Sequence, residues 1–261
     1  NIMGTAVGAH GFEADSDKAI FPIVSIEQTL GHDKGIKVKI PIVVPGLGST
    51  NIAKNNWIGL ASGAAISGII LTVGENVVAM DMEAEIKGGK ILKAPDLEFR
   101  IKTYQNWQQK GYGTVVVQAN VEDGRLSVQE YAIEKYGVEA VELKWGQGAK
   151  DIGGEVKIKD LKKAQELRKR GYIVLPDPLD PNVIEAFEKK SFSEFERHSR
   201  VGMVEEGSFL NRVEELRRAG AKYVFLKTGA YRPADLARAI KFASKAKIDL
   251  LTVDGAGGGT G

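Results

Sequence analysis

Cysteine is absent from this 261-residue chain. Its absence excludes a disulfide framework, a thiolate nucleophile and an iron–sulfur cluster held by the chain's own residues. Histidine is also scarce. The three histidines, His10, His32 and His198, do not pair at the spacing of metal ligands, so we expect no metal site. The chain has neither a G-x-S-x-G elbow nor a Ser-His-Asp arrangement, which argues against a serine hydrolase.

A surplus of charge is lacking too, because 36 basic and 34 acidic side chains leave a net charge of +2. Nucleic-acid binding needs a basic face, and nothing in the sequence resembles one. There is no secretory signal and no apolar run long enough to cross a membrane, so we expect a cytoplasmic protein with no nucleic-acid or membrane partner. With 43% hydrophobic residues, the chain can form a sizeable core.

Short apolar runs alternate with helical patterns along most of the chain. The alternation predicts an α/β fold with a parallel sheet wrapped by helices, either a closed barrel or an open doubly wound sheet. The length suits one TIM-type barrel, which needs about 250 residues. The predicted strands cover residues 40–45, 68–73, 114–118, 140–144, 223–227 and 248–253, and two weaker ones cover 172–175 and 201–204. The predicted helices cover residues 53–66, 103–110, 127–136, 158–170, 182–196, 208–219 and 233–245.

The flanks of this pattern are less regular. Residues 1–39 have no strong periodicity, so we expect an N-terminal segment that packs on a barrel domain of residues 40–261. Gly88-Gly89 suggests the turn of a small hairpin, and Ser208 is a candidate helix N-cap. The chain opens in a loop-like stretch and stops at Gly261 in a glycine-rich turn. We therefore expect a barrel that is incomplete at its C-terminal end.

Polar and glycine residues follow the predicted strands, at the points where the strands end. In either architecture the carboxyl ends of parallel strands form the functional edge, so these side chains should line one mouth. The candidates are Glu75 after the second strand, Gln118 and Asn120 at the third, Lys144, Gln147 and Lys150 at the fourth, and Lys227 at a later one.

Lysines at strand ends suggest an anion site. Lys144 ends an apolar strand, where a lysine costs free energy unless it meets an anion or water. Lys150 lies in a glycine-rich loop, and with Lys227 it completes a set of three cations; for Lys150 alone, a solvated loop is the simpler interpretation. Glu75 is the best candidate acid, although a surface glutamate is an equal alternative.

The stretch from Asp254 to Gly261 is the sharpest local signal. Glycines let the backbone approach a ligand, and successive N–H groups can form a cup for phosphate. A flexible loop is the alternative. The stretch lies outside a first βαβ unit, which argues against a dinucleotide fold, and no P-loop motif occurs. The candidate cofactor-binding residues here are Gly255, Gly257, Gly258, Gly259 and Thr260.

The motifs together resemble those of a known family. Lys144-Trp-Gly-Gln-Gly-Ala-Lys150, followed by Gly153-Gly154, resembles the K-x-x-Q-G-A-K…G-G segment in the FMN-binding domain of glutamate synthases. Gly74-Glu75, the segment 124–131 and the segment 254–261 resemble three further motifs of that domain in the same order. The resemblance spans roughly residues 40–261. The chain is most similar to the archaeal-type, separately encoded FMN subunit.

The resemblance implies a (β/α)8 barrel with bound FMN. It implies reduction of 2-iminoglutarate, formed from 2-oxoglutarate and ammonia, to glutamate by hydride from reduced flavin. A glutaminase subunit would release the ammonia from glutamine, and another subunit would donate electrons. The family's iron–sulfur cluster would be held only by cysteines beyond this chain.

The resemblance also implies roles for particular residues. Lys150 would lie near the flavin N1/O2 edge and stabilise the anionic reduced flavin. Lys144 and Gln147 would meet a substrate carboxylate or the flavin pyrimidine. Glu75 would face the substrate and manage a proton.

Two positions depart from the family pattern. Leu47-Gly48 replaces the usual Met-Ser pair after the first strand, and Ala119-Asn120 replaces a Lys-Gln pair after the third. These departures keep two alternatives open. One is a related FMN barrel enzyme that uses another amine, similar to N-methylglutamate synthase. The other is a non-catalytic barrel subunit.

Overall fold

A six-stranded parallel sheet forms the centre of the computed structural model, which describes residues 25–33, 35–145, 155–200 and 205–255. Its order is β13-β12-β8-β7-β4-β3, so each strand pairs with the next parallel strand along the chain. A doubly wound sheet would reverse direction at a switch point, and this order does not. The strands are β3 (Val43–Leu47), β4 (Ile70–Val73), β7 (Val115–Ala119), β8 (Ala140–Lys144), β12 (Tyr223–Thr228) and β13 (Leu250–Val253).

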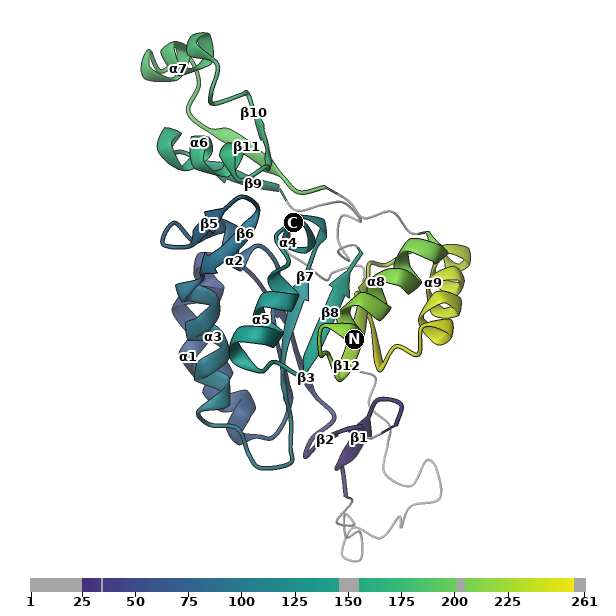
Figure 1. Ribbon diagram of the computed structural model, residues 1–261. Helices are drawn as coiled ribbons and strands as arrows, with labels where there is room; N and C mark the ends of the chain where they lie inside the picture. Colours follow the sequence, from purple (N-terminus) through teal and green to yellow (C-terminus); the bar gives the residue numbers. More distant parts are fainter. Residues whose placement is uncertain (1–24, 34, 146–154, 201–204, 256–261) are drawn as a thin grey trace, which may run out of the picture.

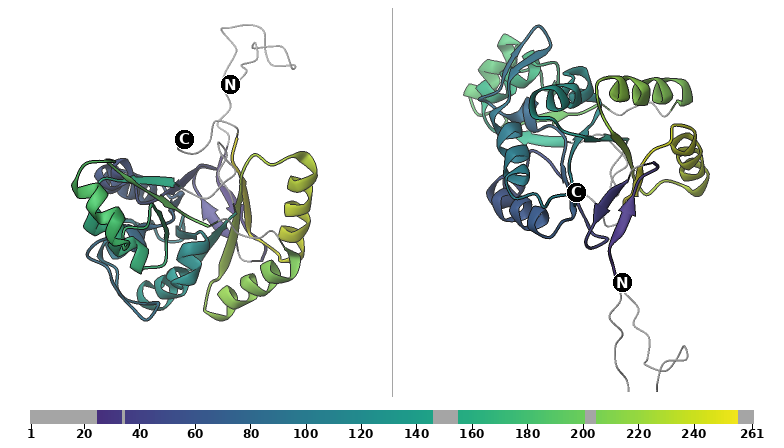
Figure 2. Two further views of the ribbon diagram at one scale, coloured as in Figure 1. Left: turned by 90° about the horizontal axis from the view of Figure 1, so that it is seen from above. Right: turned by 60° about the horizontal axis from the view of Figure 1, so that its bottom comes forward.

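The sheet curls into a half-barrel with its helices on the outer face (Figures 1 and 2). Parallel strands joined by right-handed crossovers in one winding direction place every connecting helix on the same side. Within the described ranges, β3 and β13 are the two sheet edges. The α/β class is thus confirmed. The covering helices are α1 (Asn51–Ile66), α3 (Pro95–Gln105), α5 (Val128–Tyr136), α8 (Glu206–Arg218) and α9 (Pro233–Lys245).

Each face of the sheet has its own apolar core. Outward residues such as Leu71 and Val117 pack under the helices, while inward residues such as Val116 and Phe225 form a separate cluster. A hairpin of β1 (Gln28–Leu30) and β2 (Ile36–Val38) packs against this inner cluster at the N-terminal end of the strands (Figure 2). The segment before residue 40 therefore contains a regular hairpin, which its sequence pattern did not predict.

The inner face becomes polar toward the carboxyl ends of the strands. Because side chains alternate along a strand, the residues two positions beyond the inner apolar layer point the same way. Phe225 is followed in this way by Lys227, and Ala140 by Glu142 and then Lys144. The inner polar layer comprises Thr72, Gln118, Glu142, Lys227 and Thr252.

An insertion between β8 and β12 lies above the carboxyl ends of the strands, at the top of Figure 1. Its antiparallel sheet has the order β10-β11-β9. The weak strand predicted at 172–175 belongs to this sheet and is not a barrel strand. The helix predicted at 182–196 was wrong in its second half, because α7 ends at Glu188 and β11 begins at Phe195. The elements are β9 (Glu155–Ile158), α6 (Leu161–Lys169), β10 (Ile173–Leu175), α7 (Pro181–Glu188) and β11 (Phe195–His198).

Other boundaries need correction. The helix predicted at 103–110 overlaps α3 only at residues 103–105, because α3 begins at Pro95, where proline suits a first helical turn, and ends at Gln105. Glu205, and not Ser208, caps α8 by accepting from the backbone N–H groups of Gly207 and Ser208. The turn at Gly88-Gly89 is confirmed, between β5 (Glu85–Lys87) and β6 (Lys90–Lys93).

Two short helices, α2 (Val77–Met80) and α4 (Val121–Arg125), follow β4 and β7. The strand predicted at 201–204 lies outside the described residues. In the part of the chain that the structure describes, no helix has both the length and the apolar character to span a bilayer.

Candidate functional site

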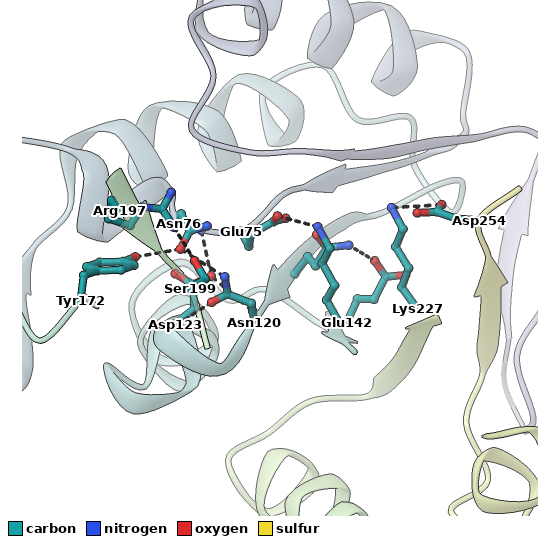
Figure 3. Close-up of polar contacts among 12 residues, drawn as sticks. Glu75, Asn76, Asn120, Asp123, Glu142, Tyr172, Arg197, Ser199, Lys227 and Asp254 are labelled. Carbon is teal, nitrogen blue, oxygen red and sulfur yellow. Dashed lines mark hydrogen bonds and ion pairs between the residues drawn. The ribbon is translucent and has the colours of Figure 1, made fainter. Parts of the chain in front are cut away.

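Two ion pairs lie at the carboxyl ends of the strands (Figure 3). Lys144 Nζ donates to Glu75 Oε1 at 2.5 Å, and the two side chains are only 8% and 11% exposed. Lys227 Nζ lies 3.3 Å from Asp254 Oδ1, with both side chains similarly shielded. Burial raises the pKa of the Glu75 carboxyl, but the charge and hydrogen bond of Lys144 outweigh it, so the net pKa is lowered. Glu75 is therefore an ionised carboxylate at neutral pH.

A buried acid lies beneath these pairs in the polar layer. Glu142 on β8 accepts from Gln118 Nε2 at 2.5 Å and from Thr252 Oγ1 at 3.4 Å. Burial raises the pKa of Glu142, and the hydrogen bond from Gln118 and the charge of Lys227 offset only part of that rise. The layer therefore joins β7, β8 and β13 through one carboxyl group whose protonated form burial favours.

Close backbone packing directs Glu75 into this site. A Cβ built on Gly48 would lie 2.4 Å from the Glu75 carbonyl oxygen, and one on Gly74 would lie 2.5 Å from the Gly48 nitrogen. A side chain at either position would force the ends of β3 and β4 apart. Position 48 therefore requires glycine, because no other residue fits against Glu75 in this arrangement.

Arg100 on α3 fixes the same turn from the helix side. It is fully buried, and its Nη1 donates to the carbonyl oxygens of Leu47 at 3.2 Å and Gly48 at 2.9 Å. Its guanidinium carbon lies 4.7 Å from the ring centroid of Trp57. Asp96 completes the shell around the guanidinium. The turn after β3 is thus held by a charged donor as well as by glycine packing.

Asn120 is engaged with the protein rather than directed freely into the mouth. Its Oδ1 accepts from the Asp123 backbone N–H at 3.0 Å, and its Nδ2 donates to Asn76 Oδ1 at 3.2 Å. The first bond caps α4, and the second fixes the residue after Glu75. Asn120 supports the site through these contacts.

A cavity of about 390 Å³ adjoins Lys144 and Asn120. Trp145 and Phe209 form an aromatic wall, with ring centroids 4.8 Å apart and planes at 67°. Arg125 also lines the cavity, and within the described ranges its guanidinium has no ion-pair or hydrogen-bond partner. The cavity lies beside the covering helix α8, and it combines an apolar wall with Arg125, Arg212 and the Glu215 carboxylate.

The structure brings several of the predicted residues together at one mouth. Gly255 is exposed and directly follows Asp254. The remaining predicted residues, Gln147, Lys150, Gly257, Gly258, Gly259 and Thr260, lie outside the described residues. Those that meet at the mouth are Glu75, Gln118, Lys144 and Lys227, whereas Asn120 contacts Asn76, the residue after Glu75.

Sequence reasoning missed Glu142 and Asp123, although each left a signal. Glu142 interrupts an apolar strand two residues before Lys144, so period-two alternation places both on one face. Asp123 stands three residues after Asn120, which is the spacing of a capping box.

No protein-family model matches the chain, and a search of curated proteins finds no match either.

Proposed function

We propose that this chain is an FMN-dependent oxidoreductase of glutamate synthase type, which reduces 2-iminoglutarate to glutamate. The proposal includes a (β/α)8 barrel, to which the six described parallel strands contribute. One observation carries it: the strand-end residues of the family-like motifs converge on a single mouth, where Lys144 and Glu75 form a buried pair beside Gln118 and Lys227.

The donor set fits the hydrogen-bonding edge of a flavin ring. Lys144 and Lys227 are cationic donors suited to ring carbonyl oxygens, and Gln118 retains a buried amide oxygen without a partner in the described part of the chain. Both lysines already have carboxylate partners, so neither is available as the main charge for a phosphate. We therefore assign the phosphate to the glycine-rich segment 254–261 and the N1/O2 charge to Lys150, as the resemblance implies.

Bound FMN would supply hydride to the imine carbon. The residues of the chain must then bind the substrate carboxylates, exclude water and hold a proton for the nitrogen. Because the pKa of Glu75 is lowered, Glu75 is an ionised acceptor for the hydrogen bond from Lys144 Nζ. Lys144 would be the proton donor to the substrate nitrogen, and Glu75 orients its ammonium group. Arg125 has a free guanidinium for a substrate carboxylate.

A second candidate keeps FMN and changes the amine. The cavity beside Lys144, with its wall of Trp145 and Phe209, is larger than ammonia requires. An aromatic wall of this kind would favour an alkylamine over ammonia. This observation supports an enzyme similar to N-methylglutamate synthase.

The test begins with flavin. The full-length protein should copurify with FMN or take it up, giving the flavin absorption bands; a colourless protein that refuses FMN would end both proposals. Photoreduced flavin should then be reoxidised by 2-oxoglutarate with ammonia, and comparison with methylamine separates the two candidates. Bound FMN that reacts with neither mixture would point to the non-catalytic alternative.

A matched pair of variants assigns the chemistry to the mouth. Lys144→Arg keeps the charge but alters its position, so it should slow flavin reoxidation while FMN stays bound. Lys222→Met removes an exposed lysine that pairs with Glu139 on the surface, and should leave the rate unchanged. Equal effects of the two changes would contradict a role for Lys144.

A further inference from the structure

Asp123 on α4 is a buried carboxyl group that the proposed chemistry does not use. It is only 1% exposed. Its Oδ2 accepts from the backbone N–H of Asn76 at 2.9 Å and from that of Asn120 at 3.4 Å. Its Oδ1 has no hydrogen-bond partner in the described part of the chain. A buried carboxyl group aimed at a backbone N–H suggests that it determines the conformation of that segment.

The segment in question immediately follows Glu75. Asn76 has φ 64° and ψ 10°, the left-handed conformation that non-glycine residues rarely adopt. Three hydrogen bonds hold it there: the one from its backbone N–H to Asp123, and two that its Oδ1 accepts, from Asn120 Nδ2 and from Tyr172 OH at 2.8 Å. On the other side, Gly48 packs against the Glu75 carbonyl. The backbone that carries Glu75 is thus held from both sides.

The same contacts join the insertion to the mouth (Figure 3). Tyr172 precedes β10, and the Arg197 guanidinium carbon on β11 lies 4.9 Å from the centroid of its ring. Nearby, Arg200 Nη1 lies 2.9 Å from both carboxylate oxygens of Glu122, the residue before Asp123. The insertion therefore contacts both Asn76, through Tyr172, and α4, through the pair of Arg200 and Glu122.

We propose that Asp123 is a positioning residue, which holds Glu75 toward Lys144 through the Asn76 N–H and makes that alignment depend on the docked insertion through Tyr172. The role of Glu75 in this statement rests on the proposed function. The hydrogen-bond geometry itself does not depend on it.

The charges around Asp123 are consistent with this role. Glu75 faces it from the β4–α2 turn, and Arg197 and the Tyr172 phenol face it from the insertion. Glu122, its neighbour on α4, is paired with Arg200. Burial raises the pKa of Asp123 to about 7, the charge of Glu75 adds to the rise, and the N–H donors and Arg197 oppose it. When protonated on the partnerless Oδ1, the carboxyl group still accepts through Oδ2. Asparagine should therefore replace it, because the amide oxygen retains the acceptor.

The first experiment needs no activity. Amide hydrogen exchange of Asn76 should be about tenfold faster in Asp123→Ala, close to wild type in Asp123→Asn, and intermediate in Tyr172→Phe, which removes only a hydroxyl group. Should the alanine variant fail to fold, the asparagine and phenylalanine variants decide the question. Unchanged Asn76 exchange in a folded Asp123→Ala or in Tyr172→Phe would overturn the proposal.

The second experiment concerns turnover. Asp123→Ala should lower kcat by about tenfold to a hundredfold while FMN affinity stays unchanged, and Asp123→Asn should restore it. In a Glu75→Gln background, Asp123→Ala should cause no further loss, because its effect passes through Glu75. Additive losses would overturn the positioning role. A wild-type protein without turnover would reject the proposed function, and the exchange data would still decide the role of Asp123.

Discussion

The buried pair of Lys144 and Glu75 allows a test of the mouth geometry that is independent of any substrate. Lys144→Met removes the ammonium and leaves a similar volume of side chain. The partners are 2.5 Å apart and 8% and 11% exposed, so water cannot fully replace the lost contact. Breaking one side of a buried pair costs about 3–5 kcal/mol, because the remaining charge is left uncompensated. We expect the free energy of unfolding to fall by about that much.

The pH dependence should reverse sign as well. In the wild type, the pKa of Glu75 is lowered, so its contribution to stability is present above the unfolded value of 4.5 and is lost as pH falls. In Lys144→Met, burial remains while the main opposing charge is gone, so the pKa of Glu75 should rise. Its contribution is then present at low pH and is lost as pH rises through the raised value.

Urea unfolding of the full-length protein at about pH 5 and about pH 8 measures both effects. The double variant Lys144→Met/Glu75→Leu should recover most of the stability, since no buried charge remains unpaired. Lys189→Met is the matched control, because Lys189 and Glu185 are 69% and 61% exposed, and it should change little. If Lys144→Met lowers the free energy of unfolding only slightly and does not reverse its pH dependence, the conclusion that Lys144 and Glu75 form a buried ion pair is wrong.

Three further predictions concern the scaffold. Gly48→Ala should destabilise the protein by about 1–3 kcal/mol in urea unfolding, since its Cβ meets the Glu75 carbonyl, whereas Gly63→Ala meets nothing and should be neutral or stabilising. Arg100→Met should lower the free energy of unfolding by at least the value of one charged hydrogen bond, about 1.5–3 kcal/mol, because the carbonyl groups of Leu47 and Gly48 lose their donor. A loss near zero would contradict the conclusion that Arg100 anchors the turn after β3. Because burial raises the pKa of Asp123 from 3.8 to about 7, its contribution to stability is present below the unfolded value and is lost as pH rises toward 7. Asp123→Asn should remove this pH dependence of the free energy of unfolding. An unchanged pH dependence would contradict the raised pKa.

The local sequence pattern was sufficient to predict those strands and helices that have a clear apolar run or helical periodicity. The apolar runs of β4, β7, β8 and β12 and the helices α1, α5 and α9 lie close to their predicted positions. The positions of Glu75, Gln118, Lys144 and Lys227 at one edge follow from the rule that parallel strands end together. Alternation along β8 also sets Glu142 and Lys144 on the same face.

The insertion shows what local pattern cannot supply. The strands β9 and β11 are short and carry charged residues, and their stability comes from pairing with each other across a separation of about 40 residues. The β1–β2 hairpin likewise depends on the inner core that Ile36 and Val38 enter. In both cases the sequence alone contains no periodic signal from which the element could be predicted.

Which residues pair with the charged side chains was likewise determined by the tertiary structure. The sequence by itself determined the α/β order of the chain and which side chains stand at strand ends. Only the tertiary structure paired Lys144 with Glu75, set Glu142 beneath them, and connected Asp123 and Tyr172 to Asn76. The reason is physical: periodicity records which face a residue occupies, whereas burial, pKa and hydrogen bonding depend on neighbours that lie dozens of residues away along the chain.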